Sequence, residues 1–422
     1  MKEDFLHYLW KNKKFNFTNL VSTDKEEIVI LNSGLYLQKE GPDFFNAQIV
    51  IGNQKWAGNV EIHLKSSDWY LHHHEEDANY ENVILHVVWE HDSEIFRKNN
   101  TKIPVLELKN LVSKHDIDKY SELTKLKSWI YCENSLNEVD DFILSKWQER
   151  LYFERLEKKI IPIESFLQEN ENDWEATLFA FLLKGFGLNI NGEAFFQIAK
   201  SIPFSIIRKE RYNLDNLEAL LFGFANLLND ELEDVYYKML QENWNYLKIK
   251  YKLEDSLFEI VHFFKLRPDN FPTIRLAQIA MFYHLQDNLF TKIISCKNNI
   301  EFYDLFKVQV SDYWETHYVF DKVSKMREKK ITNKFIDLLL INVIVPFQFL
   351  YAKKRGNDVL ENSISILNGL PSESNAVISK FNSFGVKTNS AFHSQALLQL
   401  KNEYCNHKKC LNCDIGLSLL KQ

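Results

Sequence analysis

The fold of this chain is decided by the stretch FNAQIVIGNQKWAGNVEIHLK, residues 45–65. Apolar residues alternate with polar ones or run together in FNAQIVIG (45–52) and WAGNVEIHLK (56–65), which is typical of β-strands. Between them lies Gly52-Asn53-Gln54-Lys55, which has the residues that a tight hairpin turn uses. The stretch therefore predicts a β-hairpin.

The residues around the hairpin predict more of the same sheet. Three further strands are indicated by IVIL (28–31), NVILHVVWE (82–90) and IPVLELK (103–109). A helix is predicted before them over EDFLHYLWKNK (3–13), because its large apolar residues recur at helical spacing. The first part of the chain is thus expected to be α+β.

The spacing of the apolar residues changes after this region. From about residue 138 to about residue 400 the apolar residues recur at i, i+3 and i+4, as in 140–160, which predicts helices. With 12 glycines and 8 prolines in 422 residues, turns are sparse and long helices are favoured. We expect an α+β domain over 1–120, a junction over 121–137 and a large all-α domain over 138–422.

Composition limits the classes of partner and the location. The net charge of -7 gives no global positive field, so binding to nucleic acid would need a local patch. The start MKEDFLHYLW lacks the basic and apolar regions of a signal peptide. The apolar stretch 335–352 contains Asp337 and Pro346, so a buried helix is predicted. We expect a soluble cytoplasmic protein with no membrane partner, and the oligomeric state stays open.

The richest chemistry lies on the hairpin. Residues i and i+2 of a strand face the same side, so Glu61, His63 and Lys65 share one face of the sheet. Asp43 follows Gly41-Pro42 at the start of the other strand. A three-residue turn would place Asp43 opposite His63, whereas a turn of two or four residues would place it on the other face. The sequence therefore permits this cluster without requiring it.

These residue types suit metal-assisted hydrolysis. A hard cation such as Mg²⁺ or Mn²⁺ needs carboxylate oxygens held close together, and it promotes phosphodiester hydrolysis by activating water and neutralising charge. We expect Asp43 and Glu61 to hold the metal, with His63 or Lys65 positioning the attacking water. The alternative is that Asp43 caps a turn while Glu61 and His63 line an exposed face of the sheet.

The order of these residues resembles the PD-(D/E)XK nuclease superfamily. There a Pro-Asp opens one strand of a hairpin and an acid-x-Lys motif closes the next, on an α-β-β-β-α-β core. The resemblance implies a nuclease-like α/β sandwich, with Pro42-Asp43 and Glu61-Ile62-His63 as the motif. His63 stands where the family has Lys, so Lys65 would substitute or the site would be inactive. A literal Glu-x-Lys at 107–109 is better explained as the solvent-facing end of a strand.

The chain also resembles an uncharacterised bacterial family, domain of unknown function 2851. That resemblance implies the domain order and brings no established activity. It rests on EDFLHYLW (3–10), GPDFFNAQI (41–49), WAGNVEIHLKSSDWY (56–70), NVILHVVWEHD (82–92), LRPDNFPTIRLAQIA (266–280) and YCNHKKCLNCDIG (404–416).

Further histidines follow the hairpin. His72, His73 and His74 are consecutive, and three consecutive residues of a helix cannot all face one metal, so a solvated polar run is the preferred interpretation. One of them could still approach the site from above. His86 lies in the middle of a strand, where it is either a satisfied core histidine or an acid/base group that faces the site.

Cysteines crowd near the C-terminus. Cys405, Cys410 and Cys413 have the spacing of a metal site, and His407 or Cys132 would supply a fourth ligand. Either Zn²⁺ or an iron-sulfur cluster fits such a set, and the cluster resembles the iron-sulfur staple of some nucleases in the same superfamily. The alternative is a group of reduced, partly buried thiols, since the five cysteines make a poor disulfide framework.

Three functions are open on these grounds. The first is a divalent-metal-dependent nuclease, in which Arg150, Arg155 and Lys158 of the helical part contact phosphates. Those basic residues are interleaved with glutamates, so a solvated helix face is the preferred interpretation. The second is a non-catalytic scaffold that binds nucleic acid or protein with a degenerate nuclease fold. The third is a hydrolase of another phosphoester.

Overall fold

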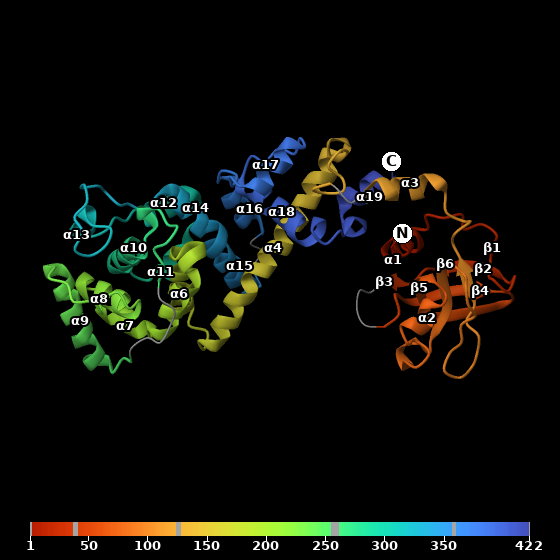
Figure 1. Ribbon diagram of the computed structural model, residues 1–422, viewed down its shortest axis with the longest axis horizontal. Helices are drawn as coiled ribbons and strands as arrows, with labels where there is room; N and C mark the ends of the chain where they lie inside the picture. Colours follow the sequence, from red (N-terminus) through yellow and green to blue (C-terminus); the bar gives the residue numbers. More distant parts are fainter. Residues whose placement is uncertain (1, 37–40, 124–127, 255–260, 357–359, 422) are drawn as a thin grey trace. The chain divides into compact units, whose positions relative to one another are not determined.

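The computed structural model describes residues 2–36, 41–123, 128–254, 261–356 and 360–421. Internal contacts divide the chain into two compact units (Figure 1). Unit 1 comprises Met1–Trp147, Ser383–Val386 and Leu400–Gln422, and unit 2 comprises Gln148–Asn382 and Lys387–Gln399. The C-terminal segment, which we expected at the end of an all-α domain, thus packs with the α+β part.

Among the described residues, unit 1 holds a seven-stranded mixed sheet with the order β1-β2-β4-β5-β6-β7, and β3 pairs with β4. Strands β1 to β5 pair antiparallel, whereas β5, β6 and β7 are parallel. The five predicted strands are confirmed; the two-residue strands β1 and β3 are too short to give a periodic signal. The bounds are β1 Leu20–Val21, β2 Glu27–Asn32, β3 Leu35–Tyr36, β4 Phe44–Ile51, β5 Gln54–Lys65, β6 Val83–Glu90 and β7 Val105–Glu107.

The register of the β4–β5 hairpin changes along its length. Ile51 pairs with Gln54 across a two-residue turn, in which Gly52 has the positive φ of 59° that such turns need. With this register Asp43 would face the opposite side of the sheet from Glu61. A β-bulge between Phe44 and Ala47 adds one residue, and Asn46 takes a φ of 54° there. Phe44 consequently pairs with Val60, which brings Asp43 to the side of Glu61.

Two apolar layers cover the sheet of unit 1. Phe5 and Leu9 of α1 pack with Val60 and Ile62 of β5 in the larger cluster. The other cluster gathers around the fully buried Trp69. Each large side chain buried in this way contributes about 1.5–3 kcal/mol. The helices are α1 Glu3–Asn12, α2 Asp68–Leu71, α3 Lys114–Leu123 and α19 Asp414–Lys421, with helical turns at Ala78–Tyr80, Leu136–Glu138, Leu400–Cys405 and Cys410–Asn412.

Unit 2 is helical, as the apolar spacing predicts. Its first helix, α4 (Asp141–Glu169), begins in unit 1. The others are α5 Trp174–Phe186, α6 Leu188–Ser201, α7 Phe204–Glu210, α8 Leu214–Phe224, α9 Val235–Tyr251, α10 Pro272–Leu285, α11 Leu289–Ser295, α12 Asn299–Leu305, α13 Asp312–Thr316, α14 Asn333–Leu339, α15 Val345–Lys354, α16 Leu360–Asn368, α17 Ala376–Ser383 and α18 Ala391–Gln399. Short 3₁₀ and π turns lie at Pro268–Asn270 and Leu340–Ile344.

The predicted buried helix is confirmed. Helices α14 and α15 are joined by the π-helical turn Leu340–Ile344, two residues before Pro346. Proline has no N–H to donate, and the wider turn accommodates that loss. The whole run Asn333–Lys354 is long and apolar enough to cross a membrane, but its most apolar window is 78% buried inside the structure. Most of this window is therefore packed inside the protein.

A buried carboxyl in unit 2 gives a test of this packing. Glu218 on α8 is fully buried and accepts hydrogen bonds from Tyr236, Ser311 Oγ and Trp314 Nε1. Burial raises the pKa of Glu218 to about 7, even though these hydrogen bonds act to lower it. Between about pH 4.5 and pH 7 the Glu218 carboxyl is therefore protonated in the folded state and ionised in the unfolded state.

The contribution of Glu218 to the free energy of unfolding should be complete below pH 4.5. It should be lost, by about 3 kcal/mol, as the pH rises to about 7. In Glu218→Gln this part of the pH dependence should vanish, whereas the exposed Glu231→Gln should keep it. Urea unfolding at pH 5 and pH 8 measures the difference. Equal pH dependence in all three proteins would contradict the expectation.

Candidate metal centre on the sheet

Two carboxylates meet where β4 begins and β5 passes it. The backbone N–H of Asp43 donates to Oε2 of Glu61 at 3.1 Å, and the backbone N–H of Ile62 donates to Oδ2 of Asp43 at 3.0 Å. The two side chains are thus fixed by each other's strand. The sequence left open whether Asp43 shares the face of Glu61 and His63. The structure places Asp43 on that face, beside Glu61 rather than opposite His63, and the bulge at Asn46 is the reason, not a three-residue turn.

Glu61 is only 5% exposed and faces histidines. Its Oε1 lies 3.5 Å from Nε2 of His63 and 3.4 Å from Nε2 of His74. Burial, and then the charge of Asp43, raise the pKa of Glu61 to about 9. A buried acid beside a second carboxylate is stabilised in its charged form by a nearby positive charge, which a bound cation would supply.

Three histidines converge beside Glu61. The ring nitrogens of His63, His72 and His74 include a set in which all three atoms lie within 4.8 Å of one another. Nδ1 of His72 lies 3.1 Å from Nε2 of His63. His73, between the other two, has a φ of 59° and is exposed. This local reversal of the chain directs His72 and His74 to one side, although consecutive helical residues could not share it.

The interpretation of 72–74 as a solvated polar run therefore holds for His73 and misses its neighbours. His74 is partly buried and stacks on Tyr80 with ring centroids 3.8 Å apart. The one sequence signal for this arrangement is the i, i+2 spacing of the two histidines after a short helix. It is a weak signal, because after a helix the two side chains converge only when His73 takes a positive φ.

His86 on β6 lies behind His63. The parallel register pairs Glu61 with His86, and Nε2 of His86 lies 2.8 Å from Nδ1 of His63. Burial, and then the neighbouring His86, lower the pKa of His63 to about 2, and burial lowers that of His86 to about 3. Both rings are therefore neutral at physiological pH. His86 therefore faces the site and contacts it through its hydrogen bond with His63.

Helix α1 adds two residues that the sequence analysis did not single out. Nε2 of His7 lies 3.0 Å from Oδ2 of Asp43, and Oε1 of Glu3 lies 3.8 Å from Nε2 of His63. Burial, and then Asp43, raise the pKa of Glu3 to about 7. Glu3 and His7 are four residues apart on the helix, so they share one edge of it. The i, i+4 spacing of Glu3 and His7 is the feature of the sequence from which they could have been found.

Lys65 does not join this cluster. Although it shares the face of Glu61 and His63 by strand alternation, its side chain is 58% exposed and its Nζ lies 4.0 Å from Oδ2 of Asp92. The expectation that Lys65 positions a water beside Asp43 is therefore not met by its placement. Strand alternation determines from which face of the sheet the Lys65 side chain leaves. It does not determine where this long side chain ends, and here its Nζ lies near Asp92.

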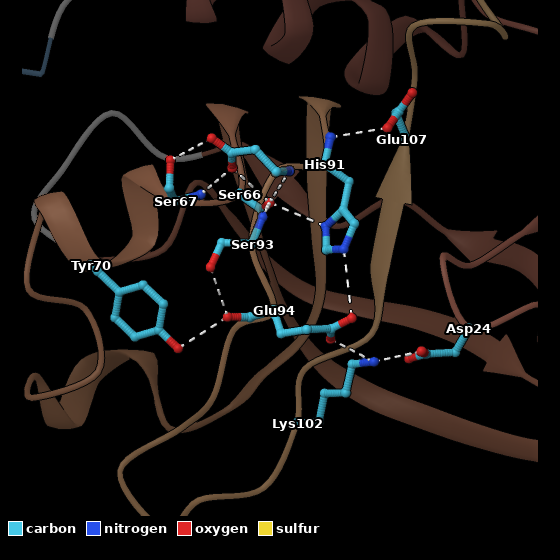
Figure 2. A network of polar contacts seen from close by, with 10 residues as sticks. Asp24, Ser66, Ser67, Tyr70, His91, Ser93, Glu94, Lys102 and Glu107 are labelled. Carbon is cyan, nitrogen blue, oxygen red and sulfur yellow. Dashed lines mark hydrogen bonds and ion pairs between the residues drawn. The ribbon is translucent and has the colours of Figure 1, made fainter.

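Asp92 accepts hydrogen bonds from Ser66 and Ser67. These two serines belong to a separate polar network at the ends of β5 and β6, together with His91 and Ser93 (Figure 2). Ser66 Oγ accepts hydrogen bonds from the backbone N–H groups of Asp92 and Ser93, and it lies 3.1 Å from Nδ1 of His91. Nε2 of His91 in turn lies 3.7 Å from Oε1 of Glu94. The order Ser-His-Glu suggests a nucleophile, but Ser66 is fully buried and its oxygen is already occupied. The network therefore holds the loop after β6.

The remaining predicted residues lie elsewhere. Glu107 accepts from the backbone of His91, and Lys109 pairs with Glu90 at the surface, as expected for a strand end. Three basic residues of α4 belong to unit 2, and none of them is placed beside the carboxylates of unit 1 by a described contact. Arg150 pairs with Glu154, Arg155 donates to Gln395 Oε1 at 2.7 Å, and Lys158 is exposed.

The four predicted cysteine ligands share one cavity in unit 1. It is lined by Cys132, Cys405, Cys410 and Cys413, together with Tyr131, Leu400, Tyr404, Ile415 and Gly416. His407, the alternative fourth ligand, is exposed and is not among the lining residues. Burial raises the pKa of Cys410 to about 11 and that of Cys413 to about 12. These are therefore protonated thiols unless a metal displaces the protons.

The backbone at the C-terminal end of this cavity is shaped for sulfur. The N–H groups of Ile415 and Gly416 donate to the Cys413 thiol. A Cβ on Gly416 would lie 2.2 Å from the carbonyl oxygen of Cys410, so only glycine fits that turn. Amide donors to sulfur are typical of thiolates that bind metals.

The fold and the site define an α+β protein with a histidine-rich candidate metal centre on a mixed sheet. The chain belongs to the family described as a protein of unknown function (DUF2851), whose model matches residues 3–376. No curated protein and no solved structure matches the chain.

Proposed function

We propose that this protein is a divalent-metal-dependent hydrolase of phosphodiester bonds in nucleic acid, with the hairpin arrangement of the PD-(D/E)XK nucleases. The observation that carries the proposal is the meeting of Asp43 and Glu61 from neighbouring strands, each fixed by a backbone N–H of the other strand. Buried acids in this position suit a cation that activates water and neutralises charge on a phosphate.

The residues of the chain would divide the work as follows. Asp43 and Glu61 would hold the metal, with His63 in the place of the family's Lys. Because His63 is neutral and its pKa is far below 7, it suits a metal ligand better than a general base. Arg150, Arg155 and Lys158 on α4 remain the predicted phosphate contacts.

The second candidate is a scaffold that binds nucleic acid or protein without cleaving it. Lys65 favours it, since this lysine of the motif strand is paired with Asp92 and not with the carboxylates. The two functions separate on cleavage of single- and double-stranded DNA and RNA by the wild type and by Glu61→Gln, with Mg²⁺, Mn²⁺ or Zn²⁺ added. Cleavage that is lost in the variant supports the hydrolase, and equal behaviour of the two proteins favours the scaffold.

We also propose that the four cysteines of unit 1 bind a structural metal centre, either a zinc ion or an iron-sulfur cluster. The support is their common cavity and the amide donors to Cys413. The centre would tie the C-terminal segment 400–422 to the segment around Cys132. It requires no role in the cleavage reaction.

A further inference from the structure

We propose that the site on the sheet selects a borderline transition-metal ion, of the Zn²⁺, Co²⁺ or Fe²⁺ kind, over Mg²⁺. The ligands are the ring nitrogens of His63, His72 and His74, with Glu61 beside them. This inference deepens the proposed function, because it names the metal of the same site, and it goes beyond the pair of carboxylates that the hairpin motif supplies.

Three of the four carboxylate oxygens of Asp43 and Glu61 already have protein neighbours. Oδ2 of Asp43 accepts the N–H of Ile62 and faces His7, and Oε2 of Glu61 accepts the N–H of Asp43. Glu61 Oε1 has nitrogen neighbours at 3.4 and 3.5 Å. Mg²⁺ prefers oxygen in near-octahedral geometry, whereas imidazole nitrogen suits zinc, iron and their neighbours.

The three nitrogens are close enough to share one ion. Zn–N bonds of about 2.0–2.1 Å require ligand nitrogens that lie no more than about 4.2 Å apart. The set in His63, His72 and His74 lies within 4.8 Å, and the pair His63–His72 is at 3.1 Å. Small rotations of the exposed His72 ring would complete the geometry.

The surroundings prepare His63 as a ligand. When Nδ1 of His63 donates to Nε2 of His86, its own Nε2 keeps the lone pair that faces His72 and Glu61. His86 is fully buried, so this support is fixed in the sheet. Such a partner behind a ligating histidine holds the ring orientation and the tautomer. His86 is accordingly a positioning residue.

The test measures metal binding directly on the full chain, without nucleic acid and without a polyhistidine tag. Purified wild type is titrated with Zn²⁺, Co²⁺ and Mg²⁺ by calorimetry, alongside His72→Asn, His74→Asn and the control His73→Asn. The control is matched because His73 lies between the two ligands and is exposed, and asparagine tolerates its positive φ. All four proteins keep the cysteines, so any metal bound there cancels in the comparison.

We expect the wild type and His73→Asn to bind one more equivalent of Zn²⁺ or Co²⁺ than His72→Asn does, with affinity lowered at least about a hundredfold in the ligand variants. Cobalt at this site should lack the thiolate charge-transfer absorption of a cysteine site. His72→Asn is the decisive variant, because His72 is exposed and its loss leaves the core intact.

The inference is overturned if the wild type binds Mg²⁺ as tightly as Zn²⁺, or if His72→Asn binds as the control does. Metal binding that is intact in a protein without nuclease activity would reject the proposed function and leave this inference standing. Cleavage supported by Mg²⁺ and unaffected by His72→Asn would do the opposite.

Discussion

Glu61→Gln is expected to lower the rate of nucleic-acid cleavage by a factor between about a hundred and ten thousand. The substitution keeps an oxygen that can accept the N–H of Asp43, so the hairpin should hold its shape. It removes the charge that would hold a cation beside the phosphate. Charge stabilisation by a bound metal contributes several kcal/mol to such a reaction, and each 1.36 kcal/mol corresponds to a factor of ten in rate.

A matched control makes this result specific. Glu90→Gln changes the same atoms on the neighbouring strand β6, where Glu90 is exposed and paired with Lys109. It should cleave as the wild type does, and Asp43→Asn should resemble Glu61→Gln. Rates are measured at equal protein concentration, after circular dichroism has shown equal folding. If Glu61→Gln and Glu90→Gln cleave equally, the hairpin is not the catalytic site.

Cys413→Ser is expected to lose the proposed metal centre and to lower the stability of unit 1 by several kcal/mol. Its sulfur is buried and receives two backbone N–H groups, so a shorter and harder oxygen can neither reach nor hold the same ion. Structural metals make large contributions to folding, about 10–16 kcal/mol in small zinc domains. Metal analysis and visible absorption of protein purified without oxygen, followed by thermal unfolding, measure both effects.

The chain contains its own control for this experiment. Cys296 lies in unit 2 after α11, whereas the four clustered cysteines belong to unit 1, and Cys296→Ser should keep the metal and the melting temperature. Zinc content would identify a single ion, and iron with visible absorption would identify a cluster. The proposal fails if the wild type holds neither metal in a stoichiometric amount, or if Cys413→Ser holds as much as Cys296→Ser.

The candidate site could be predicted in part because strand alternation is local. Glu61 and His63 share a face in any β-strand, and both lie in the site. Their meeting with Asp43 depends on the β-bulge at Asn46. No local pattern of residues around Asn46 predicts a bulge. His72 and His74 escaped prediction for a similar reason, since a single positive φ at His73 turned a polar run into two converging rings.

Longer side chains and distant segments were harder still. Lys65 has the right strand parity, yet its flexible side chain follows Asp92. Cys132 and the C-terminal cysteines are separated by more than two hundred and seventy residues, so spacing alone left Cys132 and His407 as equal candidates. The shared cavity places Cys132 with the other three.

The sequence by itself determined the five main strands, the helical second part and the buried helix over 335–352, because each follows from a local apolar period that burial rewards. It also determined which residues of one strand share a face. The tertiary structure decided which faces meet: Asp43 with Glu61, His72 and His74 with His63, and the C-terminal segment with unit 1. These contacts depend on a bulge, on one reversed residue and on chain closure over long distances, and none of these leaves a periodic signal in the sequence.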